Sequence, residues 1–256
     1  MGTRWVSIRP ERDALAIEIA RRDYGDAVVT LGGKEEPVQT MAEIKASGRM
    51  PTIEEAEAFY DSIASPRPSD GWFGSNQHIS KDFGRVQYAL GHIKPGMSVL
   101  EAGCADGGLS QHLVGAVGKE GHVTLLDISS VFLGRCQEFI SKRLPWATVE
   151  YQRTDAATFT TRRRFDVIVA MEILEHVPDP RALIGNLYRL LRKDGKLLIS
   201  VPVDTEDSLG EHVHDFKEAD IAVILGDATG QHVTVERQGN TLFAAVDKGN
   251  QVAYVR

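Results

Sequence analysis

Strands and helices alternate along most of this chain, and that alternation limits its possible folds more than any other feature of the sequence. The apolar runs that read as strands occupy residues 98–104, 122–128, 148–155, 165–171 and 196–203. The main segments with helical character between them occupy residues 109–118, 129–144 and 180–193. Strands joined by helices of this length form parallel β-α-β units, which bind ligands at the carboxyl ends of their strands.

The C-terminal part of the chain departs from this pattern. Residues 232–248 read as two strands joined by a tight Gly239-Asn240 turn, which is typical of a β-hairpin. The sequence therefore predicts an α/β fold, a doubly wound, Rossmann-like sheet of seven strands that is parallel except for an antiparallel C-terminal hairpin. The helix at 180–193 is the best bounded, with Asp179 as N-cap, Pro180 in the first turn and Gly195 just past the end.

The chain divides near residue 75 into two parts. Residues 76–256 contain the alternating units, whereas residues 1–75 read as a charged helical extension or cap. In that extension Thr52 and Glu55 have the spacing of a capping box. They precede an apolar stripe formed by Ala56, Phe59, Tyr60 and Ile63. Helices this short cannot build a core of their own, so we expect them to pack against the sheet.

Composition and charge exclude several classes of protein. With 42% hydrophobic and 25% charged residues, the composition is that of an ordinary globular protein. The net charge of −7 argues against a nucleic acid as the main partner, because phosphate binding requires clustered Lys and Arg. Cys104 and Cys136 have neither the spacing of a disulfide framework nor that of a zinc site. We find no apolar run suited to a signal peptide or a membrane span, and so expect a cytoplasmic protein.

A glycine-rich turn follows the strand at 98–104, in the stretch VLEAGCADGG. Such a turn lets backbone N–H groups approach a ligand closely. Its pattern, Glu101-x-Gly103-x-Ala105-x-Gly107, lacks the spacing that cradles the pyrophosphate of a dinucleotide. This argues against a dehydrogenase built on the same fold.

Acidic residues lie at the ends of the next two strands. Asp127 lies 20 residues beyond Gly107, where a carboxylate can accept hydrogen bonds from both ribose hydroxyls. Asp155 ends the following strand and could accept a hydrogen bond from an adenine amino group. Taken singly, each acid could merely cap a helix. Together with Glu101 they stand at three consecutive strand ends, which predicts a nucleoside cofactor without a diphosphate.

A second cluster of polar residues lies in MEILEHVPDP, residues 171–180, directly after a strand that reads as buried. Glu172, Glu175 and His176 are spaced i, i+3, i+4, so one helical turn would bring all three to one face. They could hold a metal, take up a proton, or only cap and solvate a helix. Farther on, His212 and His214 have the period-two spacing of one side of an extended segment. His176, His212 and His214 are therefore candidate catalytic bases, with a solvated polar loop as the alternative for the last two.

At these motifs the chain resembles the class I S-adenosylmethionine-dependent methyltransferases, over residues 76–248. EAGCADG resembles their motif I, with Ala105 where the family usually has its middle glycine, and LLRKDGKLLISVP resembles their strand-five motif. The resemblance implies S-adenosylmethionine as the cofactor. The residues that it and the acid pattern indicate for cofactor binding are Arg85, Glu101, Gly103, Ala105, Gly107, Asp127, Ile128, Asp155, Ala156 and Met171.

Within that superfamily, MEILEHVPDP is similar to the ubiquinone-biosynthesis O-methyltransferases, which methylate catechol-type hydroxyls. This similarity implies that Glu172, Glu175 and His176 bind Mg²⁺ or another divalent cation. We therefore predict methyl transfer to a small-molecule acceptor, favouring a hydroxyl oxygen, with the N-terminal helices over the acceptor side of the sheet. The alternatives are transfer to a sugar, natural product or modified nucleotide, and a non-catalytic scaffold that binds S-adenosylmethionine. The sequence leaves the oligomeric state open.

Overall fold

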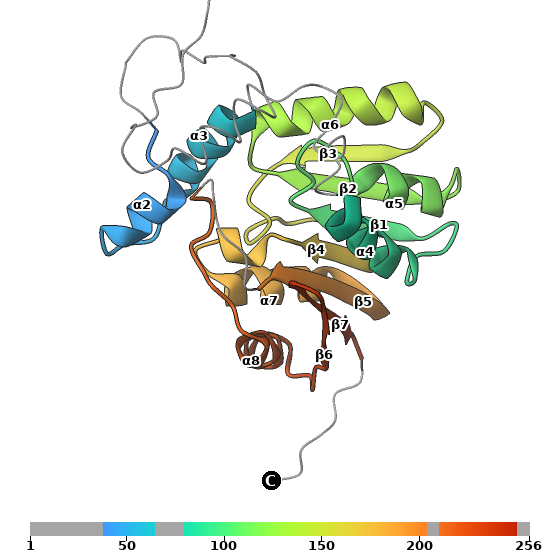
Figure 1. Ribbon diagram of the computed structural model, residues 1–256. Coiled ribbons are helices and arrows are strands. Elements are labelled where there is room, and N and C mark those ends of the chain that lie inside the picture. The colour runs from blue at the N-terminus through green and yellow to red at the C-terminus, as the bar shows by residue number, and fades with distance from the viewer. Residues whose placement is uncertain (1–37, 65–78, 204–209, 250–256) are drawn as a thin grey trace, which may run out of the picture.

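Seven strands form one sheet in the computed structural model, which describes residues 38–64, 79–203 and 210–249. They are β1 (Ser98–Ala102), β2 (His122–Asp127), β3 (Val149–Arg153), β4 (Phe165–Met171), β5 (Leu191–Pro202), β6 (Val235–Gln238) and β7 (Thr241–Asp247). Their order across the sheet is β3-β2-β1-β4-β5-β7-β6 (Figure 1). After β3 the chain crosses back over β1 to form β4, and this reversal creates the switch point at which doubly wound folds bind ligands.

The strand directions refine the expected topology. β1 pairs in parallel with β2 and β4, and β2–β3 and β4–β5 are also parallel. β7 is antiparallel to both β5 and β6, so β6 runs in the same direction as the first five strands. The predicted seven-stranded α/β sheet is thus confirmed, and the C-terminal hairpin contributes a single reversed strand inserted between β5 and β6.

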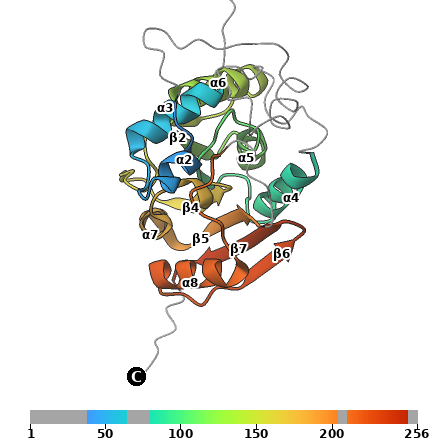
Figure 2. The same cartoon turned by 60° about the vertical axis from the view of Figure 1, so that its left-hand side comes forward.

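Helices cover both faces of the sheet (Figure 2). They are α2 (Met41–Ala46), α3 (Ile53–Ala64), α4 (Ile79–Leu90), α5 (Ser110–Val117), α6 (Ser130–Arg143), the 3₁₀ turn η2 (Leu174–His176), α7 (Pro180–Leu190) and α8 (Glu218–Thr229). Side chains of α4, α5 and α6 share one core with Val99, whereas those of α7 and α8 share another with Leu100. Successive residues of β1 thus face opposite cores, as the two-residue period of a strand requires. A sheet covered on both faces leaves its strand ends as the place for a binding site.

The boundaries of the helix after β4 are only partly as predicted. Asp179 caps α7, because its Oδ1 accepts a hydrogen bond from Ala182 N at 3.0 Å, and Pro180 occupies the first turn. Gly195, however, does not end the helix, since α7 stops at Leu190 and β5 begins at once. A Cβ at Gly195 would lie 2.9 Å from the carbonyl oxygen of Phe165, so the glycine permits close approach of β4 and β5 instead.

The structure adds a helix that the sequence pattern did not indicate, α8. Residues 154–164, between β3 and β4, form turns and no helix. Asn186 of α7 holds this connection, because its Nδ2 donates to the carbonyl oxygens of Ala156 at 2.8 Å and Phe159 at 2.9 Å. A buried amide thus replaces a helix in satisfying the backbone of the crossover.

The N-terminal helices α2 and α3 lie at the end of the sheet (Figure 1). The predicted capping box is present, since Thr52 Oγ1 accepts from Glu55 N at 3.2 Å and Glu55 Oε2 accepts from Thr52 N at 2.9 Å. Met41, Ala56 and Phe59 form a small third core with Val213, which comes from the segment after β5. The extension expected over residues 1–75 can be followed only in residues 38–64, because 1–37 and 65–78 lie outside the described residues. Across the described ranges, no helix is long and apolar enough to cross a membrane.

Candidate active site

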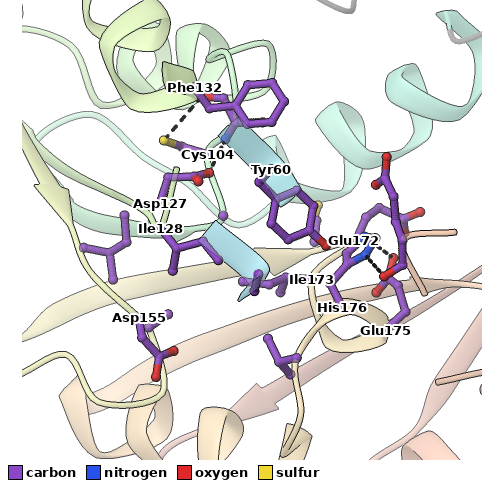
Figure 3. Close-up of a pocket in the computed structure, with 18 of the residues that line it drawn as sticks. Tyr60, Cys104, Asp127, Ile128, Phe132, Asp155, Glu172, Ile173, Glu175 and His176 are labelled. Carbon is purple, nitrogen blue, oxygen red and sulfur yellow. Dashed lines mark hydrogen bonds and ion pairs between the residues drawn. The ribbon is translucent and has the colours of Figure 1, made fainter. Parts of the chain in front are cut away.

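A cavity of about 690 Å³ lies at the carboxyl ends of β1, β2, β3 and β4 (Figure 3). Its sheet wall contains the loops that follow these four strands. Its opposite wall is one face of α3, formed by Ile53, Ala56, Tyr60 and Ile63. Contacts of α3 reach both ends of the cavity, because Ala56 shares a cluster with Ile128, next to Asp127, and the ring of Tyr60 meets that of His176. The N-terminal helices therefore cover the predicted cofactor end as well as the acceptor end on which they were expected.

The glycine-rich turn after β1 is bent by residues with positive φ. Gly103 has φ of 76° and Gly107 of 92°, and a Cβ at Gly107 would lie 2.8 Å from the sulfur of Cys136. Ala105 has φ of 44°, a left-handed conformation that costs a residue with a Cβ about 1–2 kcal/mol. Glycine is thus required at 107 for close packing against α6. Alanine at 105 is tolerated with strain.

Asp127 is oriented by two backbone amides from different elements. Its Oδ2 accepts a hydrogen bond from Ala105 N at 2.8 Å, and its Oδ1 accepts one from Ser129 N at 2.9 Å. Burial raises the pKa of Asp127 to about 6, and these amide hydrogen bonds oppose that rise. Each carboxylate oxygen keeps a second lone pair, so the pair of oxygens can accept two further hydroxyl hydrogen bonds on the cavity side.

Glu101 and Arg85 lie at the sheet end of the same cavity. Glu101 is 3% exposed, and its Oε2 accepts a hydrogen bond from Ser110 Oγ at 2.6 Å. Burial raises the pKa of Glu101 to about 8, whereas the Ser110 hydroxyl and the charge of Arg85 act to lower it. The side chain is therefore predominantly protonated at neutral pH until a cation approaches it, and the cavity lies where such a cation could bind.

The residues predicted for the adenine side also lie on the cavity wall. Asp155, Ala156 and Ile128 line the cavity together, and Met171 lines it from the end of β4. Asp155 Oδ1 accepts a hydrogen bond from Ala157 N at 2.8 Å, which fixes the turn after β3. Of the residues predicted for cofactor binding, Gly107 alone is not part of the cavity wall. Gly107 lies behind that wall, where its lack of a Cβ leaves room for the sulfur of Cys136.

At the other end of the cavity, one histidine is held by a backbone carbonyl. His176 Nδ1 lies 3.2 Å from the carbonyl oxygen of Glu211. Because a carbonyl can only accept, this contact assigns the proton of the neutral ring to Nδ1 and the lone pair to Nε2. Nε2 lies 3.6 Å from Glu175 Oε1, and the ring of His212 packs edge-on against His176 with centroids 5.0 Å apart.

The three residues with the best geometry for a metal are Glu175, His176 and His212. One ligand atom from each lies within 4.8 Å of the other two. Glu175 is 1% exposed, and within the described chain no donor reaches its Oε2. Burial, followed by the charge of Glu172, raises the pKa of Glu175 well above its usual range. A buried carboxylate oxygen without a donor fits a cation or an added proton at this point.

This candidate group differs from the expected set of Glu172, Glu175 and His176. The helical turn begins only at Leu174, and Glu172 has a left-handed φ of 53°, so the three residues do not share one helical turn. Ser200 Oγ donates to Glu172 Oε1 at 2.8 Å. Glu172 still lines the cavity (Figure 3), but His212 takes its place in the candidate ligand group.

His214 differs from His212 despite the period-two spacing of the two residues. Its Nε2 lies 2.9 Å from the carbonyl oxygen of Val177, and its ring stacks on Phe216. His214 does not line the cavity. Burial lowers the pKa of His214, which is consistent with a neutral ring that donates to Val177. The structure therefore gives His214 a packing position rather than the predicted catalytic one.

Sequence reasoning missed the site position of Tyr60. This residue belongs to the amphipathic stripe of α3 and was read only as part of a packing face. In the structure its ring meets the ring of His176 edge-on, with centroids 5.9 Å apart, and points from α3 into the cavity (Figure 3). Glu211 also lines the cavity unpredicted. Tyr60 carries no local signal, because it comes from a segment remote in sequence from the strand ends, and Glu211 is an ordinary polar neighbour of His212 in the segment after β5.

Comparison with protein families and curated proteins gives consistent results. The family described as a methyltransferase domain matches residues 79–237. A ubiquinone biosynthesis O-methyltransferase of Coxiella burnetii is 36% identical over 108 residues, which are 41% of this chain and 43% of that protein. Phosphoethanolamine N-methyltransferase 2 of Caenorhabditis elegans is 29% identical over 134 residues, 52% of this chain and 28% of that protein. The chain thus spans less than half the length of these curated relatives.

Two solved structures show the same fold. The N-methyltransferase NodS from Bradyrhizobium japonicum, in complex with S-adenosylhomocysteine, has a TM-score of 0.59 and 21% identity, covering 75% of this chain and 98% of that one. Magnesium protoporphyrin IX methyltransferase from Synechocystis, with bound S-adenosylmethionine, has a TM-score of 0.50 and 20% identity, covering 93% of both chains.

Proposed function

This chain belongs to the class I S-adenosylmethionine-dependent methyltransferases, and from that premise we propose that it transfers a methyl group from S-adenosylmethionine to a hydroxyl oxygen of a small molecule. The cofactor supplies a methyl group already activated by the positive sulfonium. The protein must therefore position the acceptor and, for a hydroxyl, remove its proton. The names of the relatives given above indicate different acceptors. Family membership is therefore the premise, and transfer to a hydroxyl oxygen is what we propose.

The observation that supports the cofactor in this proposal is the pair of amide hydrogen bonds to Asp127, and the hydroxyl acceptor is argued from His176. Ala105 and Ser129 hold the two carboxylate oxygens at 2.8 and 2.9 Å, which orients the carboxylate before any ligand arrives. A preoriented carboxylate suits the two hydroxyls of a ribose, because the ordering cost is met on folding and not on binding. Glu101, at the other side of the turn, suits the ammonium group of the methionine moiety, whose charge would favour the ionised carboxylate.

For the acceptor, His176 is the best-placed base. The Glu211 carbonyl sets its tautomer, so Nε2 is the nitrogen that can take a proton. Tyr60 and His212 pack against the ring of His176 and limit its rotation. We assign His176 the removal of the hydroxyl proton, while His212 and Tyr60 shape the acceptor end of the cavity.

A divalent cation is the alternative to this base, because Nε2 of His176 can bind a metal or take up a proton but not both. Glu175, His176 and His212 would hold it, and it would lower the pKa of a bound hydroxyl. Two imidazoles and one carboxylate form a softer donor set than the two carboxylates and one imidazole implied by the sequence. Such a set suits Zn²⁺ or a similar transition metal at least as well as Mg²⁺. Metal binding and a metal-free His176 base are the two versions of the proposal.

Cofactor binding is tested by calorimetry with S-adenosylhomocysteine. We expect binding by the wild-type chain, and we expect Asp127→Ala to weaken it by roughly 1.5–3 kcal/mol, the usual contribution of hydrogen bonds to a charged group. NADH is the control ligand. Binding of NADH without binding of S-adenosylhomocysteine would contradict the proposal. Binding of S-adenosylhomocysteine without methylation of any phenol, catechol or amine would indicate a binding scaffold.

The acceptor end is tested with His176→Ala. Methyl transfer from labelled S-adenosylmethionine to a panel of catechols and phenols should fall by roughly 10²–10⁴-fold, the usual effect of losing a general base. Affinity for S-adenosylhomocysteine should stay nearly unchanged. EDTA separates the two versions, since activity lost on chelation and restored by Zn²⁺, Mn²⁺ or Mg²⁺ indicates a metal. A thermal shift on metal addition that Glu175→Gln abolishes is the matching readout without turnover. Full activity of His176→Ala would return the cluster to a structural role.

A further inference from the structure

The helix α3 is attached to the sheet domain by two carboxylates one helical turn apart. Asp61 Oδ1 accepts hydrogen bonds from Ser129 Oγ at 2.5 Å and Val131 N at 3.2 Å, and its Oδ2 accepts one from Ser130 Oγ at 3.1 Å. Glu57 forms an ion pair with Arg153 at the end of β3. Asp61 therefore binds the first turn of α6 from an element about 68 residues earlier in the chain.

The same first turn of α6 holds Asp127. Ser129 is fully buried, and its Oγ accepts the hydrogen bond of Phe132 N at 3.1 Å, which makes it the N-cap of α6. Its own N–H donates to Asp127 Oδ1 at 2.9 Å. Ser129 thus accepts a hydrogen bond from a helix amide, donates one through its hydroxyl to Asp61 and donates one through its backbone N–H to Asp127. A displacement of Ser129 must reorient the Asp127 carboxylate.

We propose that Asp61 is a positioning residue for the cofactor, which acts by fixing Ser129 and through it the orientation of Asp127. The inference rests on the proposed function, in which Asp127 accepts the ribose hydroxyls. Asp61 does not line the cavity, so it acts on the cofactor only through its neighbours. The face of α3 formed by Ile53, Ala56, Tyr60 and Ile63 does line it. Docking of α3 therefore both covers the cavity and completes its ribose end.

The charge of Asp61 and its hydrogen bonds have opposite effects on the affinity for the cofactor. The negative charge of Asp61 adds to burial in raising the pKa of Asp127. Removal of that charge alone would favour the ionised carboxylate and strengthen its hydrogen bonds to ribose hydroxyls. Removal of the hydrogen bonds that Ser129 and Ser130 donate to Asp61 would loosen the Asp127 carboxylate. Its hydrogen bonds to the ribose hydroxyls would then weaken. The direction of the change in affinity therefore reports which effect of Asp61 matters.

Calorimetry of the full chain with S-adenosylhomocysteine tests the proposal. Asp61→Ala should weaken binding about threefold to tenfold, since the net contribution of one hydrogen bond, here the one from Ser129 N to Asp127, is about 0.5–1.5 kcal/mol. Asp61→Asn can keep the contacts with Ser129 and Val131, so its affinity should stay within about threefold of the wild type. Glu54→Ala, which removes an exposed acid from the first turn of α3, is the matched control and should leave affinity unchanged.

A double-mutant cycle separates positioning from a general loosening of α3. If Asp61 acts through Asp127, then Asp61→Ala should add no further loss of affinity in an Asp127→Asn background. An equal loss in both backgrounds, or an unaffected single Asp61→Ala variant, would overturn the inference. Should Asp61→Ala fail to fold, Asp61→Ser takes its place, because the shorter side chain also loses the contacts with Ser129 and Val131; a severalfold loss of affinity would support the inference and unchanged affinity would overturn it. A wild-type chain that binds no S-adenosylhomocysteine would remove the proposed function, and this inference with it.

Discussion

Two residues of the cavity wall have backbone conformations that side chains with a Cβ rarely adopt. Ala105 follows β1 with φ of 44°, and Glu172 follows β4 with φ of 53°. Ala105 N donates to Asp127, and Glu172 accepts from Ser200, so each strained residue is held by a hydrogen bond that its conformation makes possible. Strain of this kind costs of order 1–3 kcal/mol and persists where the surroundings impose it, most often at functional sites.

The buried carboxyl of Glu101 predicts a specific dependence of stability on pH. Burial raises its pKa to about 8, so between about pH 4.5 and 8 the folded state holds a proton that the unfolded state releases. The contribution of Glu101 to stability is therefore fully present below about pH 4.5 and is lost as the pH rises through about 8. Gln at this position can still accept from Ser110 but cannot ionise.

We therefore expect Glu101→Gln to match the wild type in free energy of unfolding near pH 4.5 and to exceed it by about 2–4 kcal/mol near pH 8. Urea denaturation at several pH values measures this difference. Glu54→Gln, at an exposed position, is the control and should show no such trend. A difference that does not change with pH would show that Glu101 is already ionised in the folded chain.

The sequence predicted the starts of those helices whose capping residues lie within the same turn. The capping box of Thr52 and Glu55 and the N-cap at Asp179 are both present, because side chain and amide belong to the same turn. The helix α8 was missed. Its apolar residues at 221–225 are contiguous, and such a run does not distinguish a strand from a buried helix by periodicity.

The turn after β4 shows the limit of a spacing argument. Residues at i, i+3 and i+4 share a face only when all of them are helical, and here the helical turn comprises Leu174–His176 alone. The place left by Glu172 in the candidate ligand group is filled by His212. Two hydrogen bonds, from the amides of Val213 and His214 to the carbonyl oxygen of Glu175, hold the segment of His212 at this turn. The register between these two segments is a tertiary property.

At the scale of the whole molecule, the N-terminal helices complete the cavity without forming part of the two main cores. Those cores contain α4 to α8 and the sheet, whereas α2 and α3 contribute to a separate small cluster with Val213. The sheet domain should therefore fold when residues 1–64 are removed. Its cavity, however, would lose the wall formed by α3 and the contacts of Asp61.

We expect this truncation to weaken S-adenosylhomocysteine binding roughly tenfold or more, because each 1.4 kcal/mol of lost contact corresponds to a factor of ten, and to abolish methyl transfer. The sequence predicted a smaller effect on cofactor binding, since it assigned the extension to the acceptor side. Calorimetry measures affinity, and circular dichroism confirms that the sheet domain is folded. Undiminished affinity in the folded truncation would show that α3 has no part in cofactor binding.

The sequence by itself determined the sheet, its parallel core, the glycine-rich turn and the acids at successive strand ends. All of these depend on hydrophobic period and on residues within one β-α-β unit, where chain connectivity already places the parts together. Only the tertiary structure decided that α3 covers both ends of the cavity and that His212 joins Glu175 and His176. The hydrogen bond from Ser129 to Asp61 is likewise a result of the tertiary structure alone. Such contacts link segments about 35 to 116 residues apart, whose juxtaposition depends on packing of the whole chain and leaves no periodic signal in any one segment.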